Sequence, residues 1–106
     1  MYNKQGSIVD DELLRKYHNR RCVLCGGTWN VAAHHCIKRS KIRLDIKENL
    51  FALCVECHTM YESSPDQFKR KFGQDKYEIL GRLKYGLTIE QVLERRDNES
   101  KGYQMD

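Results

Sequence analysis

The feature that most constrains the fold of this chain is a pair of Cys-x-x-Cys motifs. Cys22 and Cys25 form the first pair, and Cys54 and Cys57 form the second. Two thiolates separated by two residues turn their sulfurs the same way, so two such pairs can hold one Zn²⁺ with tetrahedral geometry. Five cysteines in a chain for which we expect no signal peptide favour metal ligation over disulfides. The motifs therefore predict a structural zinc site, and the alternative is a set of buried thiols without metal.

The spacing of the two pairs predicts a folded insert between them. Twenty-eight residues separate Cys25 from Cys54, whereas simple zinc ribbons use a spacer of about 15–20. A chain of 106 residues buries a modest core, so bound zinc contributes folding free energy directly. We expect one domain of the α+β class, with its core at residues 22–62, a helical extension at 64–96 and a polar tail at 97–106.

Hydropathy argues against a membrane location. Hydrophobic residues make up 40% of the chain, and the mean hydropathy is −0.76. No apolar run approaches the roughly 20 residues that a membrane-spanning helix requires. We therefore expect a cytoplasmic protein without a membrane partner.

Positive charge is concentrated in one stretch between the cysteine pairs. Residues 38–47 carry five basic side chains against one acid, Asp45, which accounts for the net charge of +4 of the entire chain. Such a local positive field suits a polyanion such as nucleic acid. A solvated basic loop without a partner is the alternative. The five basic residues are Lys38, Arg39, Lys41, Arg43 and Lys47.

Capping residues and apolar patterning predict the local elements. Asp10 can cap a first helix, Ser64 and Pro65 can begin another, and Thr88 with Gln91 has the spacing of a capping box. Trp29, Cys36 and Phe51 are expected in the core, with base stacking on DNA as the alternative for the tryptophan. The expected strands span 28–36 and 49–53, and the expected helices span 11–19, 55–61, 65–73, 75–85 and 88–96.

Four residues between and after the cysteine pairs define a more specific pattern. His34 and His35 are adjacent, Asn49 follows fourteen positions after His35, and His58 follows nine positions after Asn49. Together with the flanking cysteine pairs, this pattern resembles the HNH endonucleases of the His-Me finger, or ββα-metal, class, in its phage and bacterial form. The resemblance covers residues 22–62. It implies a ββα-metal finger stapled by the four-cysteine zinc site, and an activity that hydrolyses DNA phosphodiester bonds.

The resemblance also implies a role for each residue. His34 and His58 are expected to hold one catalytic divalent ion, Mg²⁺ or Mn²⁺ or alternatively Ni²⁺ or Zn²⁺. His35 is expected to act as the general base that activates water, and Asn49 to pin the loop between the strands. Glu62 lies one helical turn beyond His58, where some members have a third ligand; a solvated helix acid is the alternative.

One geometric requirement accompanies these roles. Neighbouring side chains on a regular strand point to opposite faces, so His34 and His35 share a site only if the strand ends or twists there. The family resemblance implies that the pair lies at the end of a strand. The basic residues Lys38, Arg39, Lys41 and Arg43 are then expected to contact the DNA backbone. One site cuts one strand, so a double-strand break requires a homodimer or two visits.

Two further interpretations remain. The segment from Phe68 to Leu80 is similar, more weakly, to the Rap-type (NinG) phage recombination nucleases, which act on branched DNA intermediates. That family usually has Gly and Asn where this chain has His34 and His58. The rival interpretation from a different class is a zinc-ribbon-like DNA-binding module without catalysis.

Overall fold

The fold is built on one antiparallel β-hairpin with helices on both sides. The computed structural model describes residues 7–94. Strand β1 (Val31–His35) pairs with β2 (Leu50–Cys54), so that Val31 lies opposite Cys54 and His35 lies opposite Leu50. The α+β class predicted from the sequence is confirmed.

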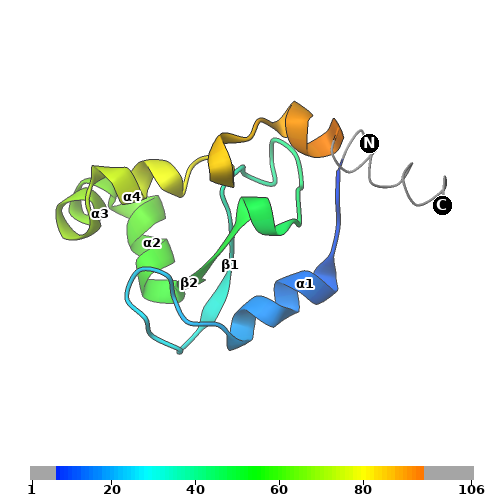
Figure 1. Cartoon of the computed structure of the whole chain (residues 1–106). Helices are drawn as coiled ribbons and strands as arrows, with labels where there is room; N and C mark the ends of the chain where they lie inside the picture. Colours follow the sequence, from blue (N-terminus) through cyan, green and yellow to red (C-terminus); the bar gives the residue numbers. More distant parts are fainter. Residues whose placement is uncertain (1–6, 95–106) are drawn as a thin grey trace.

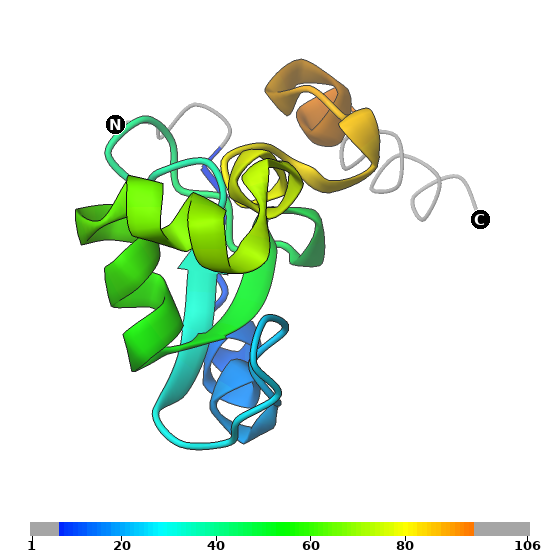
Figure 2. The same cartoon turned by 90° about the vertical axis from the view of Figure 1, so that its left-hand side faces the viewer.

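Short helices surround this hairpin. Helices α2, α3 and α4 gather on one side of it and α1 on the other (Figure 1), and Figure 2 views the molecule from the α2–α4 side. The helical segments are α1 (Asp11–Lys16), η1 (Tyr17–Asn19), η2 (Lys47–Asn49), α2 (Val55–Ser63), α3 (Pro65–Phe72), α4 (Gln74–Ile79) and η3 (Lys84–Gly86). Residues 89–94 are also helical.

Two of the three predicted helix caps form the expected hydrogen bonds. The Asp10 carboxylate accepts a hydrogen bond from the Leu13 N–H. The Thr88 hydroxyl accepts from the Gln91 N–H while the Gln91 side chain accepts from the Thr88 N–H, which is a complete capping box. Ser64 precedes α3, but its side chain makes no capping bond.

The first strand is shorter than predicted. We expected it to begin at Thr28, but Thr28 lies outside β1, which begins at Val31, because Asn30 adopts a left-handed conformation with a φ of 51° that breaks extended structure. Trp29 consequently lies outside the strand. The residue is 70% exposed, so the prediction that Trp29 belongs to the core is wrong. Phe51 is half-buried and packs against the core.

The helix predicted over 75–85 ends early. Helix α4 stops at Ile79, and Leu80 and Gly81 form a turn. Tyr85, in η3, has a φ of 65° that no α-helix accommodates. The early ending leaves the Leu80 carbonyl free to meet a side chain of β1. The predicted tail at 97–106 and the predicted end of the helix over 88–96 lie outside the described residues.

Two apolar clusters hold the fold together. The larger cluster joins the hairpin to the helices on both sides, with Tyr17, Leu50 and Phe68 fully buried. The smaller cluster contains Leu44, Ile46, Leu83 and Val92, and Ile8 packs against it. This second cluster lies under the loop between the strands, so both ends of the described chain support that loop.

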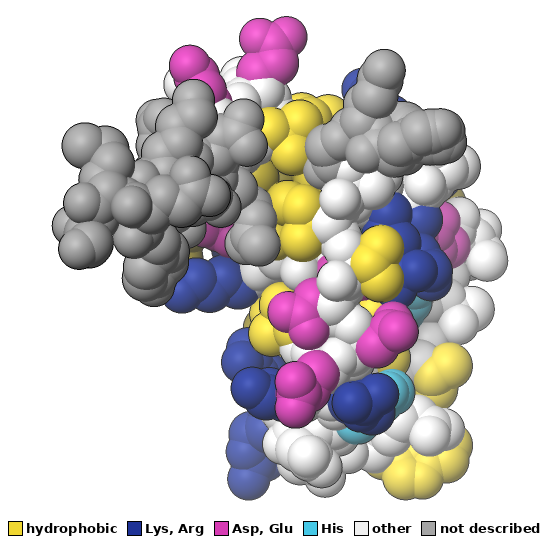
Figure 3. Space-filling view, turned by 90° about the vertical axis from the view of Figure 1, so that its right-hand side faces the viewer, with side chains coloured by type: hydrophobic (Ala, Val, Ile, Leu, Met, Phe, Trp, Pro, Cys, Tyr) yellow, Lys and Arg dark blue, Asp and Glu magenta, His cyan; other side chains and the backbone are white. Residues whose placement is uncertain are grey.

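The surface on the α1 side is mixed in charge. Figure 3 shows acidic and basic side chains interspersed over this face, and α1 itself has Asp11 and Glu12 in its first turn and Arg15 and Lys16 in its last. Among residues 7–94, no helix has the length and apolar character needed to cross a bilayer.

Candidate metal centres

The four cysteines of the two motifs meet in one cluster. The sulfurs of Cys22, Cys25, Cys54 and Cys57 all lie within 4.8 Å of one another, and the Cys25 and Cys54 sulfurs are 3.7 Å apart. Four ligands bound to zinc at about 2.3 Å would lie about 3.8 Å apart in a tetrahedron. The donor set and its spacing therefore fit a structural zinc ion.

Backbone geometry explains why these sulfurs converge. The Cys22 N–H donates to the Gly27 carbonyl, and the Gly26 N–H donates to the Cys22 carbonyl. Gly26 has a φ of 76°, which glycine adopts without steric cost and which folds the first motif back on itself. The Val23 N–H donates to Ala52 and ties this turn to β2, while the second motif begins α2 directly after β2.

The thiols of the cluster have divergent acidities. Burial raises the pKa of the Cys22 thiol, but the surrounding N–H groups of Cys25, Cys54 and Leu24 bring it down to about 7. Burial and the neighbouring thiols raise the pKa of Cys57. The surroundings therefore favour one thiolate but disfavour a second negative charge beside it. A bound divalent cation would stabilise all the thiolates together.

The fifth cysteine takes no part in this cluster. Cys36 is buried, as predicted, and burial raises its pKa to about 11. A thiol that stays protonated is a poor metal ligand and a poor nucleophile. It acts as a small apolar side chain.

A second group of metal-ligand side chains lies between β1 and α2. The ligand atoms of His34, His58 and Glu62 lie within 4.8 Å of one another. The His34 Nδ1 is 3.3 Å from the His58 Nε2, which is 3.5 Å from the Glu62 Oε1. Ligands bound to one ion at about 2.1 Å are about 3.0–3.5 Å apart. Two of the three separations therefore match those of ligands bound to one ion, and the third is no longer than 4.8 Å.

The Leu80 carbonyl orients His34 within this group. The His34 Nε2 lies 2.8 Å from the Leu80 oxygen, and a carbonyl can only accept, so Nε2 carries the proton and Nδ1 presents its lone pair to His58. Burial lowers the pKa of His34, more than the Leu80 carbonyl raises it, which favours the neutral ring that a metal ligand requires.

His35 has different neighbours. His35 is the last residue of strand β1, so the histidine pair lies at the end of the strand. The His35 Nε2 lies 2.8 Å from the Asp45 Oδ1 in the loop between the strands, and His35 is not part of the three-ligand group. The structure thus places the two imidazoles against different partners.

Asn49 is fully buried at the end of that loop. Its Oδ1 accepts from the Ile37 N–H at 2.7 Å, and its Nδ2 donates to the Leu44 carbonyl at 3.0 Å and to the Ile37 carbonyl at 3.4 Å. One side chain therefore ties both ends of the loop to the start of β2.

The basic residues of the loop fall into two groups. Lys38, Arg39 and Lys41 are exposed, and the Lys38 ammonium lies 3.9 Å from Glu62. Arg43 instead lies against carboxylates, with its Nη2 2.9 Å from Asp45 and 3.0 Å from Asp11. Lys38 of the first group thus lies beside a candidate ligand, whereas Arg43 is paired with two carboxylates.

Two groups that contact the histidines were not predicted from the sequence. Asp45 was expected only as the single acid of the basic stretch. Its isolation among basic residues was a signal, because a lone buried acid requires several donors. The Leu80 carbonyl carried no signal, since it depends on where α4 ends.

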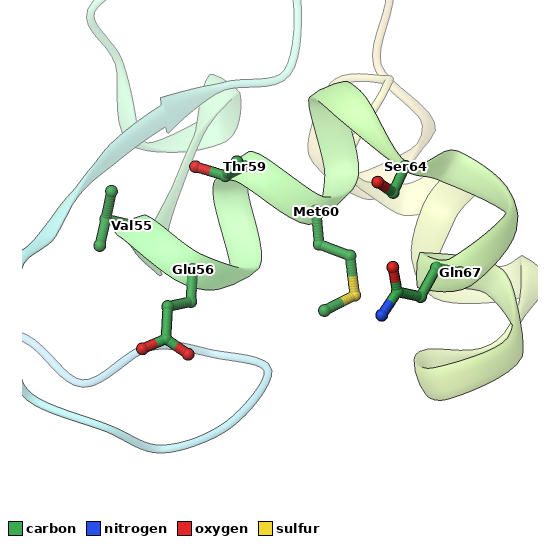
Figure 4. A pocket seen from close by; sticks show the side chains of 6 residues that line it. All are labelled: Val55, Glu56, Thr59, Met60, Ser64 and Gln67. Carbon is green, nitrogen blue, oxygen red and sulfur yellow. The ribbon is translucent and has the colours of Figure 1, made fainter.

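A separate hollow lies on the outer side of α2. It has a volume of about 340 Å³, and Figure 4 shows Met60 and Gln67 on either side of it. None of the candidate ligands lines it. Its lining residues are Val55, Glu56, Thr59, Met60, Ser64 and Gln67.

Comparisons with known proteins do not assign this chain to a family: no family model matches it, and neither does a curated protein or a solved structure.

Proposed function

We propose that this protein is an HNH-type, metal-dependent DNA endonuclease in which β1, β2 and α2 form a ββα-metal finger stapled by zinc. The observation that carries the proposal is the convergence of the His34 Nδ1, the His58 Nε2 and the Glu62 Oε1 at separations of 3.3 and 3.5 Å. The four cysteines offer a complete set of ligands for the proposed structural zinc, so this second set of ligands is free for chemistry.

The residues of the second group fit a divalent ion that keeps open coordination positions. Two imidazoles and one carboxylate leave room for water and substrate. When bound, such an ion polarises the phosphodiester and neutralises charge that develops in the transition state. Glu62 and His58 lie on the same face of α2 one turn apart, and His34 reaches them from β1.

The remaining roles follow from the positions of the side chains. His35 directly follows His34 on β1 and is the proposed general base that takes the proton from the attacking water. Asn49 holds both ends of the loop that carries Asp45, and so fixes the backbone around His35.

The exposed basic residues suit a DNA backbone beside this centre. Lys38, Arg39 and Lys41 are exposed on the loop, and the distance of 3.9 Å between the Lys38 ammonium and Glu62 supports a position of this loop beside the proposed ion. Contacts of this kind position a phosphate without reading sequence. Arg43 is better assigned to the Asp45 network than to DNA.

A nicking assay tests the proposal directly. Zinc-loaded protein is incubated with supercoiled plasmid and with Mg²⁺, Mn²⁺ or Ni²⁺, and conversion to the open-circular form is measured. We expect His58→Ala to abolish nicking, because the variant loses one of two imidazole ligands. His18→Gln is the matched control, since His18 is exposed and lies outside the ligand group.

The outcomes separate the rival functions. Nicking by wild-type and His18→Gln protein, with none by His58→Ala, supports a nuclease. DNA binding without nicking under any of the metals contradicts it and favours a non-catalytic zinc-ribbon-like module. A four-way junction included beside linear duplex shows whether branched DNA is the preferred substrate.

A further inference from the structure

Asp45 is a buried carboxylate with a complete set of donors. Its Oδ2 accepts from the Arg43 Nε at 3.0 Å and from the Asp10 N–H at 2.9 Å, and lies 2.9 Å from the Arg43 Nη2. Its Oδ1 faces the His35 Nε2 at 2.8 Å. The side chain has no solvent exposure. One oxygen is therefore anchored by three donors, which leaves the other for His35.

The N-terminal segment of the described chain secures this carboxylate. The Asp45 N–H donates to the Ile8 carbonyl, and the Ile8 N–H donates to the Arg43 carbonyl, both at 2.8 Å. Asp11 holds the outer side of the Arg43 guanidinium at 3.0 Å. Asp45 is thus fixed by the segment before α1 as well as by its own loop.

The ionised carboxylate determines which nitrogen of His35 carries a proton. Burial raises the pKa of Asp45, but hydrogen bonds from Arg43, the Asp10 N–H and His35 outweigh burial and hold the pKa below its usual value. A carboxylate can only accept, so the facing Nε2 of His35 must be protonated. The lone pair of the neutral ring then lies on Nδ1.

We propose that Asp45, anchored by Arg43 and the N-terminal segment, is a positioning residue that holds His35 in the tautomer with its lone pair on Nδ1. This inference rests on the proposed function, because it assigns the base atom of that reaction. A general base is effective only when the correct nitrogen is free and its ring is fixed in direction.

The variant Asp45→Asn tests this role with little change in shape. Three donors face Oδ2 and one faces Oδ1, so the amide should turn its oxygen toward Arg43 and Asp10 and its NH₂ toward His35. The NH₂ group that then faces the His35 Nε2 needs an acceptor, so the ring proton of His35 moves from Nε2 to Nδ1. The ring keeps its place, but the base atom is blocked.

The first measurement is the tautomer of His35, read from ¹⁵N chemical shifts of the full-length, zinc-loaded protein at mildly alkaline pH. Wild-type protein is expected to show a protonated Nε2 and a bare Nδ1, and Asp45→Asn the reverse. A proton on Nδ1 in wild-type protein overturns the proposal, whether or not the variant folds.

The second measurement is plasmid nicking as a function of DNA concentration. Asp45→Asn is expected to lower kcat by roughly 100- to 10,000-fold, as wrong-tautomer variants of a catalytic histidine do, with KM changed by less than about threefold. Asp66→Asn is the matched control, because Asp66 is an exposed acid in the first turn of α3. A folded Asp45→Asn protein with wild-type kcat overturns the proposal.

The two measurements also separate failure of this inference from failure of the proposed function. Absence of nicking by wild-type protein would refute the nuclease, while the ¹⁵N shifts would still decide whether Asp45 sets the tautomer of His35. Nicking by wild-type protein with an unchanged tautomer in a folded Asp45→Asn protein would refute the inference alone.

Discussion

The Nδ1 atom of His34 and the Nε2 atom of His58 face each other across 3.3 Å, although 24 positions separate the two residues in the chain. His34 lies on β1, whereas His58 lies on α2 directly after the last cysteine of the four-sulfur cluster. The sulfur cluster joins the first turn of α2 to the turn before β1. The proposed structural zinc therefore also sets the position of the second group of ligands.

Removal of zinc is expected to unfold the protein. The Cys54→Ser variant loses one of four thiolates at the junction of β2 and α2, where zinc binding contributes directly to folding free energy. Zinc content and thermal unfolding followed by circular dichroism are the measurements. Cys36→Ala, which alters a buried thiol outside the cluster, should retain one zinc per chain. A Cys54→Ser protein with the wild-type Tm would contradict a structural role for the metal.

Truncation of Asn49 is expected to destabilise the fold markedly. Asn49→Ala leaves the Ile37 N–H and the Leu44 carbonyl without their side-chain partners in a buried place. The expected loss is about 2–4 kcal/mol of the free energy of unfolding, measured by urea denaturation. Asn19→Ala, at an exposed position, should change it by less than about 0.5 kcal/mol. Equal losses of stability in the two variants would contradict the role of Asn49 as the anchor of the loop.

The two groups of basic residues are expected to respond differently to substitution. Lys41→Gln removes an exposed charge, so it should weaken binding to duplex DNA and reduce the slope of log K against log salt by about 0.9. Arg43→Gln removes a partner of buried Asp45, so it should lower the free energy of unfolding by about 3–5 kcal/mol. Fluorescence anisotropy at several salt concentrations and urea denaturation measure the two effects. An Arg43→Gln protein with wild-type stability and weakened DNA binding would contradict the assignment of Arg43 to Asp45.

Acid is expected to weaken the protein through Asp45. The pKa of Asp45 in the folded protein is below its usual value, so its contribution to stability is complete above the unfolded pKa of about 3.9 and is lost as pH falls toward the folded pKa. The difference in free energy of unfolding between wild-type and Asp45→Asn protein should therefore shrink below about pH 4. Urea denaturation across this range measures it, and a difference independent of pH would be inconsistent with an ionised Asp45.

The sequence predicted those parts of the molecule whose chemistry is local. Spacing within each Cys-x-x-Cys pair determines how its sulfurs turn, and the Asp10 cap and the Thr88–Gln91 box act over three residues. The strands were expected from the residue types along the chain, whereas their pairing was expected only from the family resemblance. The Cys-x-x-Cys turns and the helix caps depend on neighbouring residues alone, which is why their predictions hold.

The errors occur where one unusual backbone conformation or a distant contact decides the outcome. Trp29 is apolar and was expected inside, but the left-handed Asn30 beside it turns the chain before β1 begins. Helix α4 ends at Ile79, and the carbonyl of the next residue meets His34 across 46 positions of sequence. Arg43 looked like its basic neighbours until the fold placed Asp45 and Asp11 beside it. The pattern of residue types along the chain does not predict such conformations and contacts.

The number of divalent ions per chain tests the central claim most directly. Native mass spectrometry of protein loaded with zinc and then with Mn²⁺ or Ni²⁺ counts the ions held by the sulfur cluster and by the imidazole–carboxylate group separately. We predict two ions in wild-type protein and in the His18→Gln control, and one ion, the zinc, in His34→Ala and His58→Ala. A single ion in wild-type protein, or two ions that persist in both alanine variants, would contradict the account.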